Sequence, residues 1–204
     1  ITTATEAHGR HKKQTGGHGQ FGHIWLELEP LDRGSGIVFV NAIKGGTIPR
    51  EYIPAVEKGV RQALDNGPMA GYPLVDMQVK LVDGSYHDVD SSEMAFRSAG
   101  MLAIREGVPK GKPVLLEPIV DLEVTTPGEH LSDVIGDLGT RRAQIRNIEG
   151  QDEIQVVRAY LPLGETFSYT TALRSITRGR ATFTMEFRHY EPVNAELLKT
   201  LVRV

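Results

Sequence analysis

The chain has 204 residues, of which 40% are hydrophobic and 24% charged, and its formal net charge at pH 7 is -3. This composition supports a packed core, and the small net charge argues against a generic polyanion-binding protein. Because there is no cysteine, disulfide frameworks, thiolate metal sites and cysteine nucleophiles are excluded. The longest apolar runs have four residues, far short of the roughly 20 that cross a membrane. We therefore expect no membrane contact and a cytoplasmic location.

The first half of the chain alternates strand and helix patterns. The predicted strands cover residues 21–31, 37–41 and 75–81, and the predicted helices cover 49–66 and 91–105. Asp90 with Glu93 is a plausible capping pair for the second helix, and Gly107 with Pro109 is expected to end it. The first unit is therefore predicted to be a sheet covered by two helices.

Residues 8–23 concentrate basic residues, glycines and four of the seven histidines, with no acidic residue. The histidines could in principle bind zinc or nickel through their imidazoles: His8, His11, His18 and His23. Irregular spacing, the absence of a carboxylate among them and the interleaved cations count against a metal site. We expect a solvated polar loop and no bound metal.

Two glycine motifs resemble nucleotide-binding loops but lack the required context. Residues 17–22 fit GxGxxG, yet a strand pattern rather than a helix follows them. Residues 107–112 have three residues between their glycines, and Pro113 replaces the Ser or Thr of a phosphate loop. His87-Asp88 allows an acid/base pair, but a polar hairpin tip is the simpler interpretation. Neither a nucleotide site nor a catalytic residue is predicted.

The second half of the chain reads as βαββαβ, after a linker at 107–113. Its predicted strands and helices, in order, cover 113–126, 127–142, 144–150, 153–163, 164–179 and 180–193. Pro118 in the first of these strands indicates an edge or a bulge. Strands divided in this way by two helices are typical of the ferredoxin-like arrangement, an antiparallel sheet with both helices on one face.

Seven blocks of sequence carry a family resemblance that covers nearly the whole chain. In order and spacing they resemble the C-terminal two domains of bacterial elongation factor G: 13–23, 43–59, 67–79, 83–96, 112–119, 133–138 and 173–187. The resemblance implies an α+β protein. Residues 1–112 would form domain IV, a ribosomal protein S5 domain 2-like α/β module. Residues 113–204 would form domain V, a ferredoxin-like βαββαβ domain with a C-terminal helix.

The family resemblance also implies a function, that of a ribosomal translocase. The tip of domain IV would enter the decoding centre of the small subunit and help to move transfer RNA and messenger RNA together. Domain V would touch the sarcin-ricin loop and the stalk base of the large subunit. GTP and Mg²⁺ would be bound in a G domain outside this fragment, which would itself hold no cofactor and hydrolyse nothing. The implied partners are the ribosomal RNA and the tRNA-mRNA complex, and we expect a monomer.

The residues implied to contact RNA lie in two loops. The first tip loop comprises Gly16, Gly17, His18, Gly19 and Gln20; the second comprises Ser85, Tyr86, His87 and Asp88. Glycines let a backbone approach a nucleic acid closely, and polar side chains can bond 2'-hydroxyls and phosphates without reading sequence. Cations behind the loops would attract phosphates: Arg10, Lys12 and Lys13.

One position departs from the family pattern: His18 stands where the family commonly has Arg. This change removes a permanent charge and is a mark of a paralogue. Two alternatives to the translocase therefore stay open at this point. One is a paralogous ribosome-binding GTPase that acts in recycling or ribosome protection, and the other is a His-rich metal-binding protein.

Overall fold

The computed structural model describes residues 1–14, 19–69, 71–151 and 153–194. Contacts within the chain divide it into two compact units, Ile1–Val114 and Leu115–Val204. Each unit has its own sheet and its own hydrophobic core. In the part of the chain that is described, no helix is both long and apolar enough to pass through a membrane.

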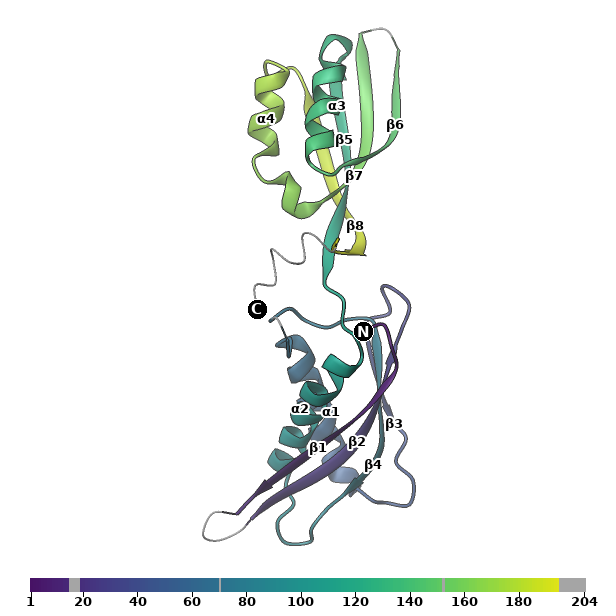
Figure 1. Cartoon of the computed structure of the whole chain (residues 1–204), viewed down its shortest axis with the longest axis vertical. Coiled ribbons are helices and arrows are strands. Elements are labelled where there is room, and N and C mark those ends of the chain that lie inside the picture. Colours follow the sequence, from purple (N-terminus) through teal and green to yellow (C-terminus); the bar gives the residue numbers. More distant parts are fainter. Residues whose placement is uncertain (15–18, 70, 152, 195–204) are drawn as a thin grey trace. The chain divides into compact units, whose positions relative to one another are not determined.

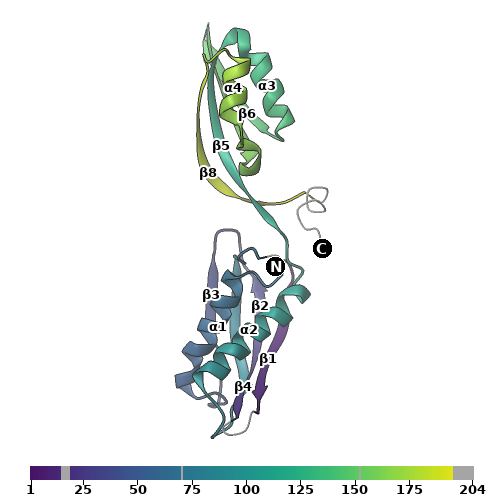
Figure 2. The same ribbon diagram turned by 90° about the vertical axis from the view of Figure 1, so that its left-hand side faces the viewer.

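The first unit is a four-stranded sheet with its α-helices on a single face, as Figures 1 and 2 show. Its strands are β1 (Thr5–Lys13), β2 (Gln20–Pro30), β3 (Ile37–Asn41) and β4 (Met77–Ser85). Its helices are the 3-10 turn η1 (Arg50–Tyr52), α1 (Ile53–Asp65) and α2 (Glu93–Lys110). The strand order is β1-β2-β4-β3; β3 runs parallel to β4, and the other neighbours are antiparallel.

The core of the first unit lies between the sheet and the helices, as the alternation in β2 predicts. Ile24, Leu26 and Leu28 are at most 1% exposed and belong to one cluster with Val56 and Val60 of α1. Full burial of such a side chain contributes roughly 1.5–3 kcal/mol. A register slip by one residue would turn this face to solvent, so the alternation fixes how β2 pairs.

Glycines let the elements of the first unit meet at backbone distance. A side chain at Gly9 of β1 would collide with the carbonyl oxygen of Ala99 in α2. One at Gly59 of α1 would collide with the carbonyl oxygen of Arg97, and Gly100 meets the backbone of α1 in the same way. These close approaches leave no room for a larger residue at any of the three glycines.

The expectation of a solvated loop over residues 8–13 is wrong, because these residues belong to strand β1 at the edge of the sheet. The strand pairs with β2 from Thr5 to Lys13. Its inward positions include Ala7 and Gly9, which are buried. Residues this small give little hydrophobic alternation, so the strand pattern is hidden in the sequence.

The predicted start and end of the second helix are also corrected. Ser92, not Asp90, caps α2, and its Oγ accepts a hydrogen bond from the Ala95 N-H at 3.2 Å. The helix continues through Gly107 and Pro109 to Lys110. Gly107 is buried against the sheet, and a proline in the last turn costs only one helical hydrogen bond.

The second unit is an antiparallel sheet with two α-helices on one face (Figure 2). Its strands are β5 (Leu116–Pro127), β6 (Gln144–Gln151), β7 (Ile154–Pro162) and β8 (Thr182–Pro192). Its helices are η2 (Gly128–His130), α3 (Leu131–Thr140), η3 (Leu163–Thr166) and α4 (Tyr169–Ile176). The order β6-β7-β5-β8 is that of the ferredoxin-like arrangement, so the predicted α+β class and βαββαβ order are confirmed.

Three details refine the second unit. Pro118 precedes a bulge at Ile119/Val120 in the pairing of β5 with β8, as its sequence position indicates. The predicted helix over 164–179 is divided into η3 and α4 by Ser168, whose φ is 63°. The predicted C-terminal helix covers 194–204, and all of it except residue 194 lies outside the described residues.

Candidate nucleic-acid interface

Two loops of the first unit meet at one end of the sheet, which we call the tip. The end of β1, the start of β2 and the segment that follows β4 lie at the same end in both views of the ribbon (Figures 1 and 2). Gly19 N-H donates to Oδ1 of Asp90 at 2.9 Å, and Phe21 N-H donates to the Asp90 carbonyl at 2.8 Å. Asp90, which follows the second loop, therefore holds the backbone of Gly19 in the first loop and of Phe21 in β2.

Ser91 completes the connection between the two loops. Its Oγ donates to the carbonyl oxygen of Phe21 at 2.9 Å and accepts from the His87 N-H at 2.9 Å. The His87 ring is in turn 3.7 Å from the Asp90 carboxylate, measured from Nδ1 to Oδ2. This network fixes the backbone of the second loop while the His87 side chain stays 58% exposed.

The structure brings together every sequence-predicted loop residue that it describes. Gly19 and Gln20 are half-buried beside the second loop, where Ser85 is half-buried and three residues are exposed: Tyr86, His87 and Asp88. Gln20 contacts the edge strand, where its Oε1 lies 2.8 Å from Nε2 of His11. Gly16, Gly17 and His18 lie outside the described residues.

The predicted phosphate contacts lie on β1, directly behind the tip. Arg10, Lys12 and Lys13 are exposed. The Arg10 guanidinium lies 6.0 Å from the centre of the Phe21 ring. Within the described residues, no carboxylate forms an ion pair with any of the three cations. Their charge is therefore available to an anionic partner.

Sequence reasoning missed five residues of this region. Asp90 and Ser91 connect the loops, and Phe21, His23 and Trp25 form an aromatic row on β2 next to the cations of β1. The row could have been found from the alternation of β2, because Phe21, His23 and Trp25 share the face opposite Ile24 and Leu26. The roles of Asp90 and Ser91 have no signal in the sequence, because about 70 residues separate them from their partners.

His23 is the titratable group that this environment changes most clearly. Its ring centre lies 3.9 Å from that of Trp25 and 5.9 Å from that of His8. Burial lowers the pKa of His23, and repulsion from His8 and Arg10 lowers it further, while Asp83 partly offsets the change. Its Nε2 atom is buried and has no hydrogen-bond partner within the described residues. The uncharged ring is therefore favoured.

Neither glycine motif forms a nucleotide site. Residues 107–110 are the last turn of α2, so they cannot form a loop around a phosphate. The segment that begins at Gly17 continues into strand β2 and not into a helix. No group of three or more histidines and carboxylates that could hold a metal ion occurs within the described ranges.

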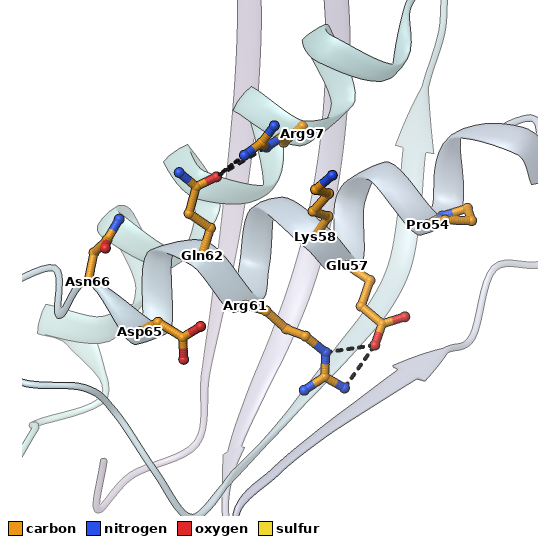
Figure 3. Close-up of a pocket in the computed structure, with 8 residues that line it drawn as sticks. All are labelled: Pro54, Glu57, Lys58, Arg61, Gln62, Asp65, Asn66 and Arg97. Atoms are coloured by element: carbon orange, nitrogen blue, oxygen red, sulfur yellow. Dashed lines mark hydrogen bonds and ion pairs between the residues drawn. The ribbon is translucent and has the colours of Figure 1, made fainter.

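An open hollow of about 510 Å³ runs beside α1 (Figure 3). Its two arginines already have partners: Arg61 contacts Glu57 at 2.8 Å, and Arg97 donates to Gln62 at 2.6 Å. With these two arginines satisfied and its walls open to solvent, the hollow offers no concentration of unpaired groups comparable to the tip.

Comparison with known proteins identifies both units. The family model described as elongation factor G, domain IV, matches residues 1–112, and that described as elongation factor G C-terminus matches residues 114–201. A crystal structure of a Thermus thermophilus protein is 42% identical to the chain, with a TM-score of 0.90. The match covers 100% of this chain and 30% of that protein. The two-part fold expected from the resemblance is therefore confirmed, and the chain belongs to the elongation factor G family.

Proposed function

We propose that this chain is the part of a ribosomal translocase that acts at the decoding centre. In this proposal the tip of the first unit inserts into the small ribosomal subunit and promotes the GTP-coupled movement of transfer RNA and messenger RNA. The contact is made by Gly16 to Gln20 of the first loop and Ser85 to Asp88 of the second.

The observation that carries the proposal is the connection of the two loops by Asp90 and Ser91. A probe that enters an RNA-lined site must keep its shape while its outer groups make contacts. Three hydrogen bonds of 2.8–2.9 Å join Gly19 and Phe21, at the end of the first loop, to Asp90 and Ser91, which follow the second. The side chains of Tyr86 and His87 remain exposed beyond them, at 45% for Tyr86 and 58% for His87.

The chemistry of the tip suits a partner whose sequence varies. Glycine and serine backbones, an imidazole and a phenol can bond phosphates, sugars and exposed base edges without selecting a base. A translocase handles every codon, so contacts of this kind are what its task requires. We assign His87 a role as a wedge or hydrogen-bonding contact to the codon-anticodon duplex, with no proton-transfer step.

The second unit is proposed to contact the large subunit at the sarcin-ricin loop and the stalk base. GTP and Mg²⁺ act in a G domain outside these 204 residues, which contribute no catalytic group to hydrolysis. The role of this chain is therefore mechanical: it converts a state change elsewhere in the parent protein into a displacement of RNA.

The proposal is tested with His87→Ala in the full-length parent protein. Loss of one or two hydrogen bonds to RNA is expected to slow translocation by roughly tenfold while GTP turnover on the ribosome is unchanged. His189→Ala in the second unit is the matched control, because that histidine is already bonded to Glu191 at 2.7 Å. An unchanged translocation rate with reduced GTP turnover would disprove the role of His87. Subunit splitting without translocation would favour the recycling alternative.

A further inference from the structure

The outer face of the first sheet, opposite the helices, carries a second set of RNA-compatible groups. We call it the outer-face patch, and it comprises six residues of β1 and β2: His8, Arg10, Lys12, Phe21, His23 and Trp25. Antiparallel pairing places them in three facing pairs, His8 with Trp25, Arg10 with His23 and Lys12 with Phe21. The neighbouring positions Ala7, Gly9 and Ile24 are buried against the helices, so the patch faces away from them.

Three aromatic members of the patch form a row of rings in contact: His8, His23 and Trp25. The His23 ring contacts those of both Trp25 and His8, and Trp25 remains 37% exposed. Because His23 is favoured in its uncharged form, the row offers flat π faces on which a planar ring can stack.

Charge on the patch increases toward the tip. Arg10 and Lys12 lie between the Trp25 pair and the tip, and no carboxylate of the described residues pairs with them. At the other end, Glu106 contacts His8 at 3.3 Å, and Asp83 is paired with Trp25 in the strand register, whereas at the tip the Asp90 carboxylate already accepts a hydrogen bond from the Gly19 N-H. A polyanion that reached the row would therefore extend toward the tip and not away from it.

We propose that the outer-face patch binds an unpaired RNA segment by stacking one base on Trp25 and placing the adjacent phosphates on Arg10 and Lys12. Stacked aromatics beside a basic track are the general means by which proteins hold single strands without reading sequence. Duplex RNA is not the expected ligand, since its bases are already stacked on one another. The proposal rests on the ribosomal function above, and it assigns a site separate from the tip loops.

Trp25 makes the proposal directly measurable, because it is the single tryptophan of the chain. Its fluorescence therefore reports on this patch alone. The 204-residue chain is titrated with a short oligouridylate, which has no secondary structure. We expect saturable quenching of Trp25, reversed by salt with a slope of about -0.7 per phosphate contacted. A self-complementary RNA duplex of the same length should quench far less.

Variants separate the patch from the tip. Trp25→Leu should weaken oligouridylate binding by about tenfold, measured by the anisotropy of a labelled strand, while Trp25→Phe should retain most of it. Tyr72→Leu is the matched control, an exposed aromatic of the same unit that lies outside the patch. Arg10→Gln serves as a second variant that leaves the aromatic row intact, and it should reduce the salt slope by about 0.7.

Two outcomes would overturn the inference. One is oligouridylate binding by anisotropy with no change in Trp25 fluorescence, and the other is equal affinity for Trp25→Leu and the unaltered chain. Neither outcome affects the proposed function, which is judged by translocation with His87→Ala. Conversely, translocation could be unchanged in His87→Ala while oligouridylate still quenches Trp25. That result would reject the role of the tip and support the patch.

Discussion

The two units share a layout, a four-stranded sheet with helices on one face, but the arginines on their sheets offer a contrast. In the second unit two guanidiniums are held by carboxylates of the same unit. Arg142 bonds Glu117 at 2.8 Å and Glu165 at 2.9 Å, and Arg158 bonds Glu123 at 2.9 Å. In the first unit, Arg10 lies over an aromatic ring and has no carboxylate partner within the described residues.

This difference separates cations that stabilise the fold from cations that are available to a ligand. Hydrogen bonds that Arg142 donates to the Glu117 carboxylate raise its pKa, and the bond that it donates to Glu165 adds to the effect. An arginine held in this way is already neutralised and cannot gain much from a phosphate. Arg10 and Lys12 can displace the counterions that surround a nucleic acid when it binds, which is the usual source of salt-dependent nucleic-acid affinity.

The largest expected effect concerns the close packing of the first unit. Gly9→Val should destabilise this unit by roughly 3 kcal/mol, because the new side chain meets the Ala99 carbonyl of α2. Urea unfolding followed by Trp25 fluorescence measures it, since that signal comes from the first unit. Gly139→Ala in α3 of the second unit is the contrast, and its unfolding is followed by circular dichroism because Trp25 lies in the first unit. A side chain at Gly139 meets nothing within 4 Å, so it should add about 0.5–1 kcal/mol. Equal changes in the free energy of unfolding for the two variants would contradict the close contact between β1 and α2.

A smaller change in stability should distinguish arginines held by carboxylates from arginines without such a partner. Arg142→Gln removes a partly buried ion pair and is expected to cost the second unit about 1–2 kcal/mol. Arg10→Gln should change stability by less than about 0.5 kcal/mol. Thermal unfolding of the two variants, followed by circular dichroism, compares them directly. If Arg10→Gln proved the more destabilising of the two, the distinction between structural and available cations would be wrong.

The smallest expected effect is a pH dependence of the stability of the first unit. Burial lowers the pKa of His23 in the folded chain below its usual 6.5. The unfolded chain therefore binds more protons between the two pKa values, and stability is lost as pH falls through 6.5 toward the folded value. Above that pH the stability is fully present. Urea midpoints read from Trp25 fluorescence at about pH 7.5 and about pH 5.5 should show the loss, and His23→Phe should reduce it. A midpoint that rises on acidification would refute the argument.

Hydrophobic alternation in the sequence was sufficient to predict most of the strands. Ile24, Leu26 and Leu28 alternate clearly, and the strand that they define is buried on the predicted face. Strand β1 was missed because its inward residues, Ala7 and Gly9, are too small to give that signal. The late end of α2 was missed for a related reason. Gly107 normally marks a helix end, but here it is retained inside the helix because the sheet lies too close for a side chain.

The candidate site was predictable in its loops and not in its connections. The glycine-rich and histidine-bearing segments are visible in the sequence, and the family resemblance assigns them to one tip. The contact between Gly19 and Asp90 depends on the fold that brings them together, and Asp90 looks like an ordinary helix cap when read alone. The aromatic row required the register of β1 on β2, which places His8 opposite Trp25.

The glycine contacts of the first unit have a mechanical consequence. Where Gly9, Gly59 and Gly100 seat one backbone directly on another, no side chain is present to change rotamer and absorb a displacement. Packed interiors have low compressibility, and an interface without rotatable groups has fewer soft degrees of freedom still. A force applied to α2 would therefore be transmitted to the strands with little loss. The first unit would then move as a rigid lever, in which a displacement at one end displaces the other.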